Sequence, residues 1–154
     1  METVGLGFYF EDLPVGRQFK TIGRTVTEAD ITNFVNCTGM VEVLFTNLEF
    51  LAHESDIKQR LAPAALVYTF AEGLLVQSTM RTPALPFCTW SSTSRTRSSP
   101  ATRSTPSARS SARRSKSRPD RGLLRTRIRV VKQDGTVALT YTPLRMVKAR
   151  EFEA

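Results

Sequence analysis

Three polar side chains between residues 42 and 53 could take part in acid–base chemistry. Glu42 lies in the apolar run 40–45, where burial would raise the pKa of its carboxyl group and suit it to proton transfer. His53 is the only histidine, and Glu54 or Asp56 could orient its ring. Asn47 could hydrogen-bond a substrate or a water. Simpler explanations stay open, because Glu42 could be a solvent-facing strand residue and His53 an exposed loop residue.

A second kind of site needs no reactive side chain. Pro63 is expected in the first turn of a helix, where the backbone N–H groups of Ala64 and Ala65 stay free to bind an oxygen that carries negative charge. Three arginines also alternate along a predicted strand, at positions 125, 127 and 129. They could contact phosphates, although a solvated outer face of a sheet is the simpler and preferred explanation.

Two helices are expected to position these groups. Thr27 can cap a helix that has Glu28 and Asp30 near its positive end, carries apolar residues at helical spacing and stops at Gly39. A longer helix is expected over residues 63–80, with an apolar surface broad enough for burial on most sides. A strand is expected over about residues 18–26, and residues 47–61 have the composition of a loop or a weak helix.

The C-terminal part predicts a β-hairpin. Residues 123–132 alternate between apolar and polar side chains, and Gln133, Asp134 and Gly135 supply the chemistry of a tight turn. The return strand is expected over about residues 136–147. Pro143 cannot donate to a strand ladder, so it marks an edge, a bulge or a bend.

Length and composition exclude several classes of protein. The 154 residues suit one domain with a moderate core over residues 1–154. No apolar run approaches the roughly 18–20 residues that cross a bilayer, and residues 1–7 show no secretory signal, so we expect a cytoplasmic protein without a membrane partner. Cys37 and Cys88 lack metal-site spacing, and there is one histidine, so neither a metal nor a separate cofactor is expected.

Residues 81–118 differ from the rest of the chain. They hold nine of the 22 lysines and arginines and none of the 14 acidic residues, which leaves 13 basic against 14 acidic residues elsewhere. This segment alone therefore creates the net charge of +8. Taken literally, the Ser, Arg, Thr and Pro of residues 91–117 predict a disordered basic linker that could bind nucleic acid. Such a linker between a helix and a hairpin does not suit a compact domain.

A shifted reading frame is the second interpretation of the tract. If each codon over residues 87–111 starts one base earlier, many serines become aliphatic residues and threonines become Asp, Asn, His or Tyr. The shift allows Ala-Gly-Asp-Thr-Ile over residues 100–104 and His-Ala-Glu-Arg-Glu-Val-Ile over residues 105–111, which alternate apolar and polar residues after a turn. We therefore predict that residues 81–114 contain two strands written in the wrong frame. Nucleic-acid binding remains an alternative only if the tract is genuine.

Several short motifs carry a family resemblance as a set. They are Tyr9-Phe10-Glu11-Asp12-Leu13, Val15-Gly16, Phe19, Val26-Thr27-Glu28-Ala29-Asp30-Ile31, Phe34, Thr38-Gly39 and Leu61-Ala62-Pro63-Ala64-Ala65-Leu66. Over residues 8–80 and 119–149 the chain resembles the MaoC-like dehydratase family, which includes the (R)-specific enoyl-CoA hydratases. The resemblance implies an α+β fold, a single hot-dog domain in which the central helix 63–80 is wrapped by a curved antiparallel sheet. It also implies a homodimer or higher homo-oligomer with acyl-CoA pockets near the subunit interface.

The family's usual catalytic pair is replaced in this chain. In the family's hydratases a glycine, matched here by Gly39, is followed by a catalytic Asp, an Asn-Pro pair and a catalytic His. Met40 stands at the Asp position and Phe45 at the His position, and neither side chain can transfer a proton. The candidates to replace the pair are Glu42, His53 and Asn47, and the expected substrate-binding residues are Met40, Phe45, Pro63, Ala64 and Ala65. In the family, a backbone N–H at the start of the central helix holds the thioester oxygen.

The resemblance therefore predicts an acyl-CoA-binding protein that hydrates enoyl thioesters or dehydrates 3-hydroxyacyl thioesters with a non-standard site. CoA enters as part of the substrate. Two alternatives stay open. One is an acyl-CoA thioesterase in which Glu42 activates water, and the other is a non-catalytic acyl-CoA-binding subunit.

Overall fold

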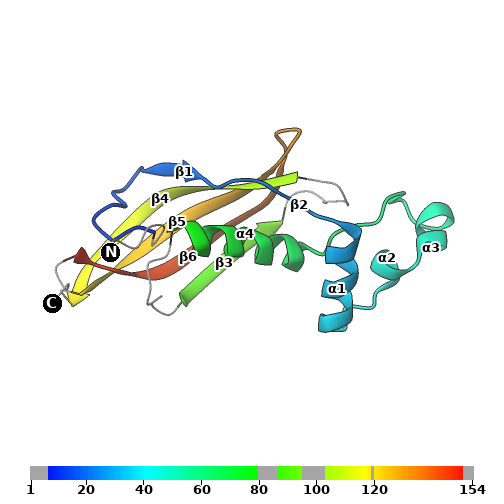
Figure 1. Cartoon of the computed structure of the whole chain (residues 1–154), viewed down its shortest axis with the longest axis horizontal. Coiled ribbons are helices and arrows are strands. Elements are labelled where there is room, and N and C mark those ends of the chain that lie inside the picture. The colour runs from blue at the N-terminus through cyan, green and yellow to red at the C-terminus, as the bar shows by residue number, and fades with distance from the viewer. Residues whose placement is uncertain (1–6, 80–86, 95–102, 119, 151–154) are drawn as a thin grey trace, which may run out of the picture.

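A six-stranded antiparallel sheet with a long helix against it makes up the described part of the computed structural model (Figure 1). The structure describes residues 7–79, 87–94, 103–118 and 120–150, and the side chains of residues 7–79, 105–108 and 120–150. The strands are β1 (Gln18–Lys20), β2 (Arg24–Thr25), β3 (Phe87–Ser94), β4 (Arg103–Arg118), β5 (Arg121–Lys132) and β6 (Val137–Lys148). Their order is β1-β4-β5-β6-β3, and β2 also pairs with β4.

The predicted hairpin is confirmed as β5 and β6. Leu124, Ile128 and Val130 of β5 are buried, whereas the arginines at 125, 127 and 129 are exposed on the opposite face. The β5–β6 pairing skips from Leu144 to Tyr141, and Pro143 lies inside this gap. Because proline has no N–H to donate, the gap is where β6 can accommodate it.

Four helices precede the second half of the sheet. They are α1 (Glu28–Thr38), α2 (Val43–Thr46), α3 (Leu48–His53) and α4 (Ala64–Thr79). The first and last confirm the two expected helices, although residue 80 lies outside the described residues. The single strand expected over residues 18–26 is wrong, because the chain leaves the sheet between β1 and β2. Glu42 is not a strand residue, because it directly precedes the short helix α2.

The anomalous tract contributes two strands of the sheet. β3 pairs with β6, and β4 pairs with β5 on one side and with β1 and β2 on the other. A disordered linker is therefore wrong for residues 87–94 and 103–118. The turn predicted between the two strands falls mostly on residues 95–102, which lie outside the described residues.

The main core lies between α4 and the inner face of the sheet. Leu66, Ala71 and Leu75 of α4 are buried in one cluster with Ile128 and Tyr141. Full burial of one large apolar side chain stabilises a fold by about 1.5–3 kcal/mol, so this layer holds the helix in place. No helix in the described part of the chain is long and apolar enough to cross a membrane.

Candidate functional site

The α1–α3 segment carries most of the sequence-predicted site residues and lies beyond the end of the sheet (Figure 1). Its start is a capping box, in which the Thr27 hydroxyl accepts from the N–H of Asp30 (3.2 Å) and the Asp30 carboxylate accepts from the N–H of Thr27 (2.8 Å). Gly39, at φ 70°, ends α1 in the left-handed conformation. The chain therefore turns at Gly39 and presents Met40 directly after α1.

Glu42 is exposed at the N-terminal cap of α2. Its carbonyl oxygen accepts a hydrogen bond from the N–H of Phe45 (2.9 Å), while its carboxylate makes no capping bond. The apolar run 40–45 is mostly exposed, with Val41 at 69% and Val43 at 47%. The burial expected from that run is therefore absent, because the residues follow the Gly39 turn outside the core.

Met40 and Phe45, which were expected at the positions of an acid–base pair, differ in their surroundings. Met40 is 38% exposed, whereas Phe45 is 9% exposed and belongs to the main core with Ala62 and Leu66. Phe45 therefore shares a core cluster with residues at the start of α4. Neither residue offers an ionisable group at this place.

Asn47 precedes α3 and His53 ends it, and α3 lies farthest from the sheet in Figure 1. The Asn47 side-chain oxygen accepts from the N–H of Phe50 (3.1 Å), so it caps α3. His53 has a side chain that is 75% exposed, and its Nε2 lies 3.4 Å from the Glu49 carboxylate, one helical turn away. Glu49 is thus the neighbour of the imidazole, rather than Glu54 or Asp56.

Arg60 holds the α1–α2 region against the segment that enters α4. Its Nε donates to the carbonyl oxygen of Phe45 (3.1 Å), and its guanidinium also donates to the Thr32 hydroxyl (3.1 Å) and pairs with Glu28. The side chain is 19% exposed. Sequence reasoning missed this residue, because nothing in its neighbourhood along the chain indicates which three segments it joins.

The N-terminus of α4 presents backbone donors to solvent. The Pro63 carbonyl accepts from the N–H groups of Leu66 (3.0 Å) and Val67 (3.2 Å), so the helix begins directly after Pro63. Ala64 and Ala65 are exposed, and no acceptor among the described residues takes their N–H groups. The helix dipole adds partial positive charge here, so this is a place for an anionic oxygen.

An apolar slot runs beneath α4 beside β2, β4 and β5. Its cavity volume is only about 10 Å³, so the side chains that line it lie almost in contact. Its lining residues are Arg24, Val26, Val67, Phe70, Ala71, Leu74, Pro106 and Val130. The Arg24 guanidinium lies 3.6 Å from the centre of the Phe70 ring and 2.9 Å from the Asp30 carboxylate, so it covers the slot on the α1 side.

The carboxylate of Asp30 is stabilised in its charged form. Burial alone would raise its pKa, but the hydrogen bonds from Thr27 and the neighbouring Arg24 guanidinium together lower the pKa below its usual value. Asp30 thus joins the cap of α1 to the residue that covers the slot.

A buried ion pair connects α4 to β6. The Arg145 guanidinium lies 2.5 and 2.6 Å from the two carboxylate oxygens of Glu72, and the Tyr141 hydroxyl donates to the same carboxylate (2.6 Å). Burial, together with the nearby Glu72 charge, raises the pKa of Tyr141. Sequence reasoning missed this group because its members lie about 70 residues apart and each looks like an isolated polar residue.

The structure thus brings together Phe45 and the N-terminus of α4, and leaves Glu42 and His53 on exposed surfaces. No family model and no curated protein matches the chain. Solved structures do match it in shape. A MaoC-like dehydratase from Rhodospirillum rubrum superposes with a TM-score of 0.81 and 24% identity, over 94% of this chain and 99% of the other.

Two further structures give the same result. A putative MaoC domain protein dehydratase from Chloroflexus aurantiacus has a TM-score of 0.89 and 20% identity, over 100% of this chain and 44% of the other. An (R)-hydratase from Pseudomonas aeruginosa has a TM-score of 0.73 and 14% identity, over 93% of this chain and 86% of the other. The chain therefore has the hot-dog fold of MaoC-like dehydratases and hydratases, which confirms the resemblance at the level of the fold.

Proposed function

We propose that this chain binds acyl-CoA thioesters and interconverts enoyl and 3-hydroxyacyl thioesters. The observation that carries the proposal is the N-terminus of α4, where the exposed N–H groups of Ala64 and Ala65 have no acceptor in the described part of the chain. A thioester oxygen gains negative charge when water adds to the enoyl double bond. Backbone donors held on a buried helix stabilise that charge without having to rearrange.

The apolar slot supports the same proposal. It begins beside Val67, one turn after the N-terminus of α4, and its lining is apolar except for Arg24. Because the slot holds only about 10 Å³, an acyl chain enters it only if the lining side chains move apart, and its thioester end then lies toward the helix N-terminus. Each methylene removed from water there contributes about 0.8 kcal/mol.

Proton transfer is assigned to Glu42, since Met40 and Phe45 cannot perform it. The carboxylate takes a proton from water as the water oxygen attacks the β-carbon, and the protonated carboxyl group then returns this proton to the α-carbon of the enolate. Hydration of crotonyl-CoA, followed by loss of the enoyl absorbance, measures this reaction. Glu42→Gln is expected to lower kcat by about 10²-fold or more, whereas the exposed Glu54→Gln keeps it. Equal rates in both variants remove Glu42 from the mechanism.

The N–H assignment has its own test. Ala64→Pro removes one N–H at a helix position that accepts proline, while Ala64→Ser keeps the donor. Loss of an oxyanion donor costs about 10²- to 10³-fold in kcat, so the proline variant is expected to be slow and the serine variant normal. Equal hydration by both variants would contradict the assignment to Ala64.

A non-catalytic acyl-CoA-binding role is the second candidate. It is favoured by Phe45, which occupies the position of the family's histidine and is packed into the core. Calorimetric titration with crotonyl-CoA distinguishes the two functions. Binding without hydration and without release of free thiol identifies a binding subunit.

We also propose that a second copy of the chain covers the exposed apolar side chains of the α1–α3 segment. Val41 is 69% exposed, Val43 47% and Leu48 65%. Apolar residues gathered on one surface commonly mark an interface. Light scattering is expected to give the mass of a dimer or larger oligomer, and Val41→Glu is expected to lower it. A monomeric wild-type protein would overturn this proposal.

A further inference from the structure

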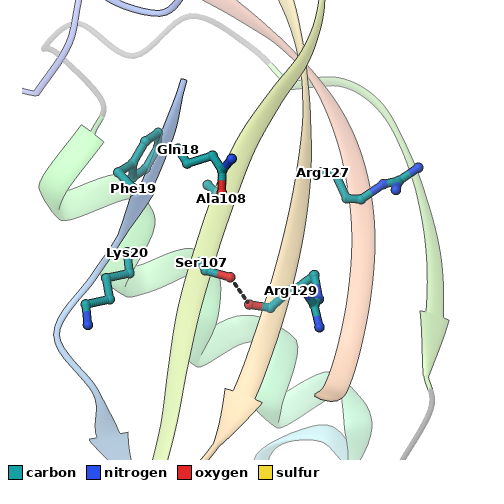
Figure 2. A pocket seen from close by; sticks show the side chains of 7 residues that line it. All are labelled: Gln18, Phe19, Lys20, Ser107, Ala108, Arg127 and Arg129. Atoms are coloured by element: carbon teal, nitrogen blue, oxygen red, sulfur yellow. Dashed lines mark hydrogen bonds between the residues drawn. The ribbon is translucent and has the colours of Figure 1, made fainter. Parts of the chain in front are cut away.

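A groove lined by cations lies on the sheet between β1, β4 and β5 (Figure 2). It has a volume of about 430 Å³. The lining residues are Gln18, Phe19, Lys20, Ser107, Ala108, Arg127 and Arg129. Lys20, Arg127 and Arg129 are exposed, and the lining contains no acidic residue. Like charges on one face of a sheet repel each other, and a sheet gains stability when opposite charges face each other across strands.

The register of β4 shows which of its positions face these cations. Position 107 lies opposite Lys20 on β1 and opposite Arg129 on β5. Position 109 lies opposite Gln18 on β1 and opposite Arg127 on β5. In the printed sequence these positions hold a serine and an arginine. The Ser107 hydroxyl donates to the Arg129 carbonyl oxygen (3.2 Å), and position 109, an arginine in the printed sequence, lies opposite Arg127 in the strand register.

The printed residues of β4 also conflict with its place in the sheet. Pro106 is fully buried, and its strand pairs with β1 and β2 on one side and with β5 on the other. Proline cannot donate to either neighbour and is ordinarily confined to sheet edges and bulges. The printed sequence therefore places a proline, which is typical of edge strands, in a strand that has neighbours on both sides.

We propose that the protein made from its gene carries glutamates at positions 107 and 109, where they form a cross-strand ion-pair ladder with Arg129 and Arg127. A reading frame shifted by one base over residues 87–111, and restored near residue 112, allows glutamate at both positions. It also allows alanine at position 106. Codon rules allow glutamate at positions 107 and 109, and the strand register places both positions opposite arginines. Position 108 between them is buried in the core, so of the two residues that the shift allows there, arginine and cysteine, the proposal requires cysteine. The arginines of the groove then form ion pairs within the chain, and the groove is not a phosphate-binding site.

Digestion of the protein expressed from its native gene tests the proposal directly. The printed sequence has no glutamate between Glu72 and Glu151, so a glutamate-specific protease leaves that stretch whole. The proposal expects cleavage after positions 107 and 109, and mass spectrometry of the fragments reads the residues between them. An uncut fragment with the printed mass overturns it. The outcome is independent of the proposed function, because no thioester enters the experiment.

A binding measurement supplies the second readout. A short DNA duplex is titrated into the native-gene protein at low and high salt. Absence of salt-dependent binding is expected, because the ladder neutralises the groove. Salt-sensitive binding together with printed-sequence peptides would instead establish the basic tract as a nucleic-acid-binding surface.

Discussion

Restoring the two acids to the printed sequence is expected to stabilise the protein measurably. Ser107→Glu with Arg109→Glu creates two opposite-charge pairs, each worth about 0.2–1 kcal/mol between directly facing residues. The second change also removes an arginine from the position opposite Arg127, and like charges at directly opposite positions destabilise a sheet by a similar amount. The gain in unfolding free energy is therefore about 1–2 kcal/mol. For a domain of this length that raises Tm by roughly 2–8 °C.

The gain is measured by thermal unfolding of the printed sequence, of the variant with two glutamates and of a control variant with two glutamines. Ser107→Gln with Arg109→Gln has nearly the same shape without the charge, so it isolates the electrostatic part. Because both arginines are exposed, the gain is expected to shrink in about 1 M salt, where screening acts over roughly 3 Å. The reasoning is refuted if the glutamine variant gains as much, or if the gain survives replacement of Arg127 and Arg129 by alanine.

Three further changes probe the contacts around the site. Arg60→Ala is expected to lower the free energy of unfolding in urea by about 1–3 kcal/mol, whereas the exposed Lys58→Ala changes it little; similar losses would contradict a joining role for Arg60. Glu72→Ala leaves the Arg145 charge buried and is expected to cost about 3–5 kcal/mol, most of which returns when both residues become methionine; no recovery would mean that packing dominates. Asp30 has a lowered pKa, so the stability it contributes is present at neutral pH and lost as pH falls below about 3.9. Asp30→Asn is expected to flatten that acid dependence. Identical urea midpoints of the wild-type protein and the variant across pH 2–7 would show that the Asp30 carboxylate does not contribute to it.

The parts of the fold that follow from local chemistry could be predicted from the sequence. Thr27 and Gly39 bound α1 as expected, and the turn before β6 follows from Asp134 and Gly135. What depends on distant contacts could not be predicted. Two features depend on the path that the chain takes away from the sheet: the break between β1 and β2, and the exposure of Glu42. No local sequence pattern predicts that path.

The same distinction applies to the candidate site. Pro63 indicated the helix N-terminus correctly, because helix starts have a local signal. Arg60 bonds residues 15 to 32 positions away, and Glu72 pairs with Arg145 73 positions away, so each residue alone looks like an ordinary surface charge. Phe45 was matched to a catalytic position by alignment, and its burial in the core is a property of the folded chain.

Position 106 matters both for the shifted reading frame and for the proposed function. Pro106 lines the apolar slot under α4 opposite Phe70, and the shifted frame allows the smaller alanine there. Pro106→Ala in the printed sequence therefore widens the slot and restores an N–H to β4. Calorimetric titration with saturated acyl-CoAs of increasing length is expected to show tighter binding of the longer chains in this variant. Pro100→Ala controls for loss of a proline elsewhere in the tract. Identical chain-length profiles in all three proteins would show that acyl chains bind outside the slot, even if the α4 N-terminus holds the thioester.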